Sequence, residues 1–186
     1  MTRLLQAFLI GTLAVLFAGA GYLFYQWQAG ARPPDPVAVG EIVLAASFAG
    51  LDDKPQALEQ WRGKVLVVNF WATWCAPCRE ETPVFTAMQD KYGTRGLQIV
   101  GLAIDRADQV RDFAREFGIN YPLLIVGFKA VEIMRTLGNT AGALPFSVIY
   151  DRNGQAILAK LGSFHADDLE SKLLPLLDGR GSGPAH

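Results

Sequence analysis

The first apolar pattern of the chain is a long uninterrupted run near its N-terminus. From Leu4 to Tyr25 the sequence has 22 residues without a charge. As a helix this stretch would span roughly 33 Å, enough for a hydrocarbon core of about 30 Å. It continues past a small-residue box at 18–20 and exceeds the signal-peptide core of about 7 to 15 residues, which favours an uncleaved anchor over a cleaved signal peptide. We therefore expect residues 1–27 to form a transmembrane signal anchor.

Residues at the two ends of this run predict its orientation. Arg3 and the α-amine precede it, and by the positive-inside rule they place the N-terminus in the cytoplasm. Tyr22, Tyr25 and Trp27 would then form an aromatic belt at the far interface. The pattern thus predicts a single-pass protein whose soluble part faces the outside of the inner membrane.

Two segments without apolar periodicity mark the limits of the soluble part. Residues 28–40 contain three prolines and are interpreted as a Pro-rich tether. Residues 178–186 are rich in glycine and are expected to form a flexible tail. A single domain is therefore expected over residues 41–177.

Within this domain, apolar β-branched runs alternate with amphipathic stretches. The continuous apolar runs at 64–71 and 97–104 predict strands that are covered on both faces. Three further strands are predicted at 121–126, 145–151 and 155–162, the last two as a hairpin. Helices are predicted over 76–92, 107–118, 128–138 and 166–177.

This order of elements predicts an α/β fold in which helices flank a mixed central sheet. We expect the sheet to be parallel in its first half and antiparallel at one edge. The preceding stretch, 41–64, is interpreted as a short strand, a turn at Asp52-Asp53 and a small helical piece laid against the same sheet.

Composition and charge narrow the function classes. With 186 residues, 51% of them apolar and 19% charged, the chain can bury a sizeable core. The formal net charge is −1, and no basic stripe is present, so the sequence indicates no nucleic-acid partner.

The only two cysteines carry the chemistry that the sequence suggests. Cys75 and Cys78 lie where the first buried strand gives way to a helix, and a helix N-terminus favours a thiolate. We expect Cys75 to be the more exposed and to act as nucleophile. Cys78, three residues later on the same helical face, would resolve a mixed disulfide. Pro77 suits the first turn, where its missing N–H would have had no partner.

Other interpretations of the cysteine pair are weaker. A static disulfide across four residues would remove little chain entropy from the unfolded state. A zinc site usually needs four ligands, and only His165 and His186 are available to supplement the two thiols. A Cu(I) metallochaperone-type module using both thiolates is the alternative function, although the three methionines form no cluster. Redox chemistry fits the βαβ context best.

The segment NFWATWCAPCREETP (69–83) resembles the thioredoxin superfamily, and within it the membrane-anchored periplasmic TlpA/ResA/CcmG-like thiol:disulfide oxidoreductases. The similarity extends over about 41–177 and includes LQIVGLAID and GALPFSVIYDRNG. It implies a thioredoxin-like fold and an enzyme with a redox-active Cys75-Cys78 disulfide and no bound cofactor. It also implies client proteins with disulfides or thiols, as in cytochrome c maturation or copper-site assembly. The nucleophile context of a thiol peroxidase is absent.

The resemblance assigns roles to Pro145 and Glu81, and at Asn69 the chain departs from thioredoxin itself. Pro145 matches the family's cis-proline, which would present the preceding backbone at Leu144 to an extended substrate. Asn69 stands where thioredoxin itself has a buried aspartate that assists proton transfer. Glu81, three residues past Cys78, matches a glutamate associated with the active site and would exchange a proton with the resolving thiol. The alternative for Glu81 is a solvated first-turn residue favoured by the helix dipole.

The remaining residues near the motif divide between recognition and structure. Trp71 fits the core as well as a functional role, and Arg79 and Glu80 are interpreted as surface charges. Pro83 is expected to kink the helix, and His165 is interpreted as a capping or surface residue. The expected substrate-binding residues are Trp74, Ala76, Pro77, Leu144 and Pro145.

The dipeptide between the cysteines suggests the direction of electron flow. Ala76 and Pro77 carry no charge that would give the thiolate extra support, which favours the reducing end of the potential scale. A reductase in an oxidising compartment must be recharged. We therefore expect a membrane electron donor of the DsbD/CcdA type, which the resemblance also implies.

Overall fold

The computed structural model describes residues 2–29 and 43–179, and within the first helix it describes the side chains of residues 6 and 9–25. Nearly all of the expected tether (28–40) and tail (178–186) lies outside the described residues. The chain forms two compact units, Met1–Asp35 and Pro36–His186.

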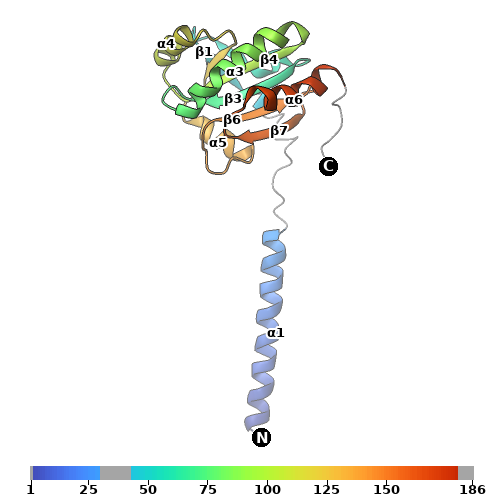
Figure 1. The fold of residues 1–186 in the computed structure, drawn as a ribbon. Helices are drawn as coiled ribbons and strands as arrows, with labels where there is room; N and C mark the ends of the chain where they lie inside the picture. The colour runs from blue at the N-terminus through green and yellow to red at the C-terminus, as the bar shows by residue number, and fades with distance from the viewer. Residues whose placement is uncertain (1, 30–42, 180–186) are drawn as a thin grey trace. The chain divides into compact units, whose positions relative to one another are not determined.

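The first unit consists of helix α1, Thr2–Ala29 (Figure 1). Its described apolar side chains are exposed to solvent. Judged on the described residues alone, no helix of the protein meets the length and apolarity of a membrane span. The helix expected over 4–25 is present, while its role as an anchor stays a prediction that rests on the sequence pattern.

The second unit is built around a seven-stranded mixed sheet with the order β2-β1-β5-β4-β3-β6-β7 (Figure 1). β3, β4 and β5 are parallel to one another, and both flanks of this parallel core are antiparallel. The strands are β1 (Ser47–Gly50), β2 (Pro55–Ala57), β3 (Val65–Trp71), β4 (Leu97–Ala103), β5 (Leu123–Ile125), β6 (Phe146–Tyr150) and β7 (Ala156–Leu161).

The expectation of a single antiparallel edge is wrong, because the stretch before β3 contributes a hairpin of its own. β1 pairs with β5 and with β2, and the turn between β1 and β2 contains Asp53 in a left-handed conformation (φ 61°). β2 has only three residues and starts with Pro55. An edge strand tolerates a proline, but a proline in a sequence argues against a strand, so the pattern did not predict β2. The small helical piece is confirmed as the 3₁₀ helix η1, Leu58–Trp61.

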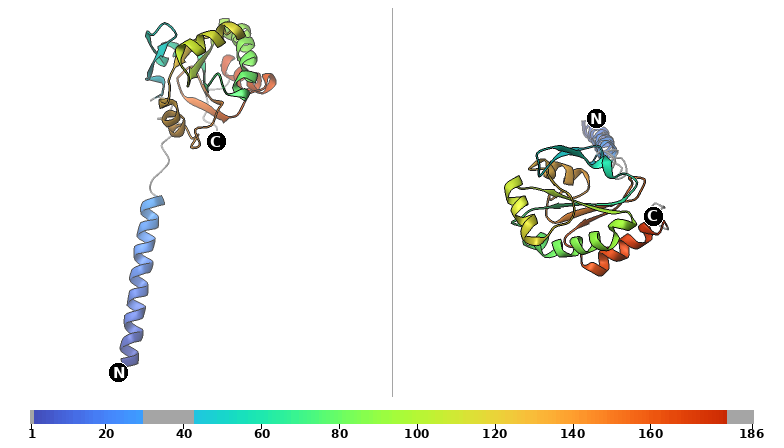
Figure 2. Two further views of the ribbon diagram at one scale, coloured as in Figure 1. Left: turned by 90° about the vertical axis from the view of Figure 1, so that its left-hand side faces the viewer. Right: turned by 90° about the horizontal axis from the view of Figure 1, so that it is seen from above.

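Helices cover both faces of the sheet, as Figure 2 shows from above. α3 (Ala76–Tyr92), α4 (Ala107–Phe117) and α6 (Ala166–Leu177) bury apolar side chains in the cluster on one face. α5 (Lys129–Thr136) and η1 contribute to the cluster on the other face. β3 is buried at every position because its side chains alternate between the two clusters. This double coverage explains the continuous apolar run predicted as a strand at 64–71.

Candidate functional site

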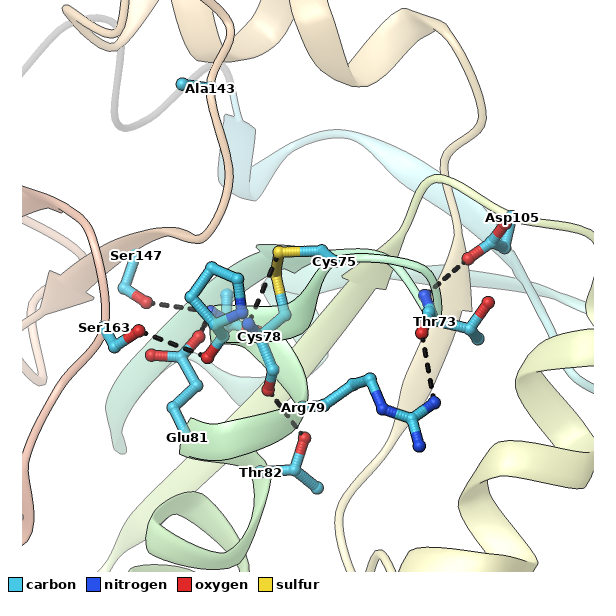
Figure 3. The surroundings of a disulfide bond; sticks show 12 residues. Thr73, Cys75, Cys78, Arg79, Glu81, Thr82, Asp105, Ala143, Ser147 and Ser163 are labelled. Atoms are coloured by element: carbon cyan, nitrogen blue, oxygen red, sulfur yellow. Dashed lines mark hydrogen bonds between the residues drawn. A yellow bond between two sulfur atoms is a disulfide. The ribbon is translucent and has the colours of Figure 1, made fainter.

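The cysteine pair lies at the N-terminus of α3, directly after the loop that follows β3. Cys75 is the N-cap of α3, and its Sγ accepts a hydrogen bond from the backbone N–H of Cys78 at 3.3 Å. The two residues form a disulfide (Figure 3). Pro77 lies in the first turn of the helix. Cys75 is the more exposed partner, as expected, with 6% of its surface accessible against 1% for Cys78. Cys75 is therefore the sulfur that another molecule reaches first.

Glu81 is buried one helical turn beyond Cys78, with 2% of its surface exposed. Its Oε1 accepts a hydrogen bond from Asn69 Nδ2 at 2.9 Å, and its Oε2 accepts one from the backbone N–H of Phe164 at 3.1 Å. The interpretation of Glu81 as a solvated first-turn glutamate is wrong, because this face of α3 packs onto the sheet. Figure 3 shows its carboxyl group on the same side of the helix as Ser147 and Ser163.

The surroundings of Glu81 raise the pKa of its carboxyl group toward neutral pH. Burial raises its pKa to about 7, from an ordinary value of 4.5. The hydrogen bonds from Phe164 and Asn69 and the positive charge of Lys160 act in the opposite direction and limit the rise. A carboxyl group with a pKa near 7 can both take up and release a proton at neutral pH, as a general acid or base must.

Asn69 links this carboxyl group to the sheet. It is buried in β3, and its Nδ2 donates both to Glu81 and, at 3.0 Å, to the hydroxyl of Ser147 on β6. The Asn69–Glu81 hydrogen bond and the contribution of Ser147 were not predicted from the sequence. An asparagine inside an otherwise apolar strand was the available signal, because a buried amide needs partners.

The peptide bond between Leu144 and Pro145 is cis, as the resemblance implied. Asn139 holds the backbone just before it. The buried Asn139 side chain donates from Nδ2 to the carbonyl of Ala143 at 2.8 Å and accepts from the N–H of Ala143 at 3.3 Å. Ala143 is labelled on the loop before Pro145 in Figure 3. Asn139 is a positioning residue that the sequence analysis missed.

The loop before the cysteines is held through both backbone groups of Thr73. Its N–H donates to Asp105 Oδ2 at 2.6 Å, and its carbonyl accepts from Arg79 Nη1 at 3.4 Å (Figure 3). Arg79 is exposed, as expected for a surface charge, yet its guanidinium also lies 5.3 Å and 5.0 Å from the ring centroids of Phe113 and Phe117. Asp105, two residues after the end of β4, is another residue that sequence reasoning missed.

The residues expected to bind substrate differ in exposure. Trp74 is 68% exposed beside the disulfide, and Ala76 and Pro77 are also exposed. Leu144 is half-buried, whereas Pro145 is buried. Their contact with a client stays a prediction.

Four further residues near the motif can be compared with their interpretation from the sequence. Trp71 is buried in the core, with its ring centroid 5.0 Å from that of Phe113. Glu80 is exposed. Pro83 lies inside α3, and the kink there stays a prediction. His165 occupies the N-cap position of α6, where its exposed side chain makes no capping hydrogen bond.

In the part of the chain that the structure describes, no group of three or more His, Cys, Asp or Glu side chains could hold a metal ion. Within these described residues, a Cu(I) site would use the two cysteine sulfurs without a third ligand of these four types.

The chain is similar to known proteins in sequence and in fold. Residues 38–173 match the family described as Redoxin. The chain is 29% identical over 162 residues to the thiol-disulfide oxidoreductase ResA of Bacillus anthracis, covering 87% of this chain and 90% of that protein. It is 28% identical to the thioredoxin-like protein YneN of Bacillus subtilis, covering 91% and 98%. A crystal structure of a putative thiol:disulfide interchange protein DsbE from Chlorobium tepidum matches with a TM-score of 0.63 at 29% identity, covering 71% and 92%.

Proposed function

We propose that this protein, a member of the Redoxin family and a thioredoxin-like thiol:disulfide oxidoreductase of the ResA/CcmG-like type, reduces disulfides in client proteins. The observation that carries the proposal is the pairing of a helix-capping Cys75 with the buried Glu81 one turn beyond Cys78. The electrons are carried by the two cysteines, without a bound cofactor.

The proposed cycle begins with the reduced protein. The Cys75 thiolate attacks one sulfur of a client disulfide, and the other client sulfur leaves and takes up a proton. Cys78 then gives its proton to the Glu81 carboxylate and attacks Cys75 Sγ. The second client sulfur leaves and is protonated, so the client gains two electrons and two protons while Cys75 and Cys78 form a disulfide.

The thiolate of Cys75 has few stabilising contacts, and this supports a cycle that runs in the direction of client reduction. Its Sγ accepts the backbone N–H of Cys78, and the helix N-terminus adds a partial positive charge. The intervening Ala76 and Pro77 are exposed and uncharged. A thiolate with so little support favours the oxidised form of the pair, which makes the reduced protein a good electron donor.

We further propose where the protein works and with which partners. The uncharged N-terminal segment supports anchoring in a bacterial inner membrane, with the thioredoxin-like domain in the periplasm. Because that compartment is oxidising, the pair would need recharging by a membrane electron donor of the DsbD/CcdA type. Apocytochrome c or copper-site assembly proteins are the client classes that we propose to test first.

Equilibrating the protein with glutathione buffers tests the direction of electron flow. We expect a reduction potential close to the value of about −270 mV typical of thioredoxin. A potential at or above about −180 mV would make the protein an oxidase or isomerase instead. A tight stoichiometric Cu(I) complex of the reduced protein, without reductase turnover, would favour the metallochaperone alternative.

A further inference from the structure

The turn between β7 and α6 contacts the active site at two points. Ser163 Oγ donates to the carbonyl of Pro77 at 3.1 Å, between the two cysteines in sequence. The next residue, Phe164, donates its backbone N–H to Glu81 Oε2 at 3.1 Å. One short turn therefore holds both the start of α3 and the carboxyl group that we assign to proton exchange.

Lys160, near the end of β7, is held over the same turn. Its Nζ forms an ion pair with Asp168 on α6 and lies 4.3 Å from the ring centroid of Phe164. Both members of the ion pair are partly shielded from solvent. The position of the cation is thus fixed relative to the residue whose N–H binds Glu81.

We propose that Lys160 is a positioning residue of the active site, which sets the charge of Glu81 while the turn at Ser163 and Phe164 holds the carboxyl group in place. This inference rests on the proton-exchange role proposed above for Glu81. In the oxidised protein the cation favours the carboxylate and keeps part of the Glu81 population ionised at neutral pH, ready to accept a proton from Cys78 after reduction.

The other groups around Glu81 do not supply this charge. Asn69 on β3 is a neutral donor, and the N–H of Phe164 is a backbone dipole. Tyr121, before β5, has its pKa raised by burial and by the charge of Glu81. Cys78 on α3 is held in the disulfide. Among the described groups that act on Glu81, Lys160 carries the positive charge, and its ion-pair partner Asp168 on α6 carries a negative charge that partly offsets it.

A carboxyl titration of the oxidised, intact protein tests the proposal, because the cysteines do not titrate in the disulfide form. The Glu81 carbon signal would be followed by NMR and assigned by its loss in Glu81→Gln. In Lys160→Met we expect the titration midpoint to rise by about half a pH unit or more. Lys160→Arg should restore the midpoint, and the exposed Lys129→Met on α5 should leave it unchanged.

The outcomes separate this inference from the proposed function. An unchanged midpoint in a folded Lys160→Met protein would overturn the role of Lys160, whatever the reductase activity. The same holds if Lys129→Met shifts the midpoint equally, since the effect would then reflect net charge. If Lys160→Met fails to fold, Lys160→Gln provides the same loss of charge. A shifted midpoint in a protein that reduces no client would support Lys160 and reject the reductase proposal.

Discussion

Asn69 Nδ2 donates a hydrogen bond to Glu81 Oε1 over 2.9 Å, so a neutral amide of the central sheet holds the carboxyl group beyond the resolving cysteine. A neutral donor stabilises the carboxylate without the strong bias toward ionisation that a directly paired lysine or arginine would impose. Together with burial, this arrangement leaves the pKa of Glu81 at about 7. The partner of Glu81 is therefore suited to a group that must change its protonation state in each cycle.

Replacing the carboxyl group of Glu81 should slow the resolution of mixed disulfides. In Glu81→Gln we expect the rate to fall by about 100-fold, because Cys78 loses its proton acceptor while the hydrogen-bonding shape is kept. Stopped-flow measurement of the reaction with a model disulfide from pH 5 to 9 would show the loss of an inflection near 7. The exposed neighbour variant Glu80→Gln serves as control, and an unchanged pH profile in Glu81→Gln would remove Glu81 from the mechanism.

Glu81 should also make the stability of the oxidised domain depend on pH. Its pKa is about 7 in the folded protein and near its ordinary value of 4.5 in the unfolded chain, so the folded state binds more protons between these values. The free energy of unfolding should therefore fall as the pH rises from about 4.5 to 7, by about 3 kcal/mol from this residue. Urea denaturation across this range should show a flatter profile for Glu81→Gln. Equal slopes for both proteins would contradict the assigned pKa.

The two cysteines should trap clients unequally. Because Cys75 is the more exposed of the two cysteines, Cys78→Ser should accumulate mixed disulfides through Cys75. Cys75→Ser should lose both capture and reduction of clients. Non-reducing gels followed by mass spectrometry would check both outcomes and identify the clients. Faster alkylation of Cys78 than of Cys75 in the reduced protein would reverse the assignment.

Asp105 should stabilise the loop that carries Trp74. Asp105→Ala leaves the N–H of Thr73 without its carboxylate partner, and we expect a loss of about 1 to 3 kcal/mol in the free energy of unfolding. Asp105→Asn, which keeps an acceptor oxygen, should lose less. Urea denaturation of the two variants at one pH compares them directly. Equal losses would indicate that the hydrogen bond contributes little.

The N-terminal segment makes a prediction about location. If residues 4–25 anchor the protein, the intact chain should sediment with the membrane fraction, and protease added to spheroplasts should degrade the domain. Mass spectrometry of the purified protein gives its first residue. A soluble form beginning near Gly21 would show a cleaved signal peptide instead.

The repeating apolar patterns predicted most of the fold. The helices at 76–92 and 166–177 were predicted with the bounds that the structure has, because the apolar residues that they bury recur at helical spacing. The β1–β2 hairpin was missed in part, since a three-residue strand that begins with Pro55 has no readable period. Strand pairing at an edge depends on contacts with β5, far along the chain.

The candidate site was predicted in its centre but not in its surroundings. The spacing of Cys75 and Cys78 is visible in a short segment, and the resemblance added Glu81 and Pro145. Residues that hold these groups come from distant segments, and nothing in their local sequence marks them. They are Asp105, Asn139, Ser147, Lys160, Ser163 and Phe164.

The position of β3 within the sheet has a consequence for hydrogen exchange. All seven of its residues pair with β4, and five of them also pair with β6, whereas the β1–β2 hairpin joins the sheet through two residue pairs with β5. Amides in doubly paired strands exchange with solvent only through large openings, while edges open locally. We therefore expect deuterium to enter the hairpin early and β3 last. The cysteine pair follows β3 after the short loop 72–74, so we expect it to be attached to the slowest-exchanging segment of the described domain.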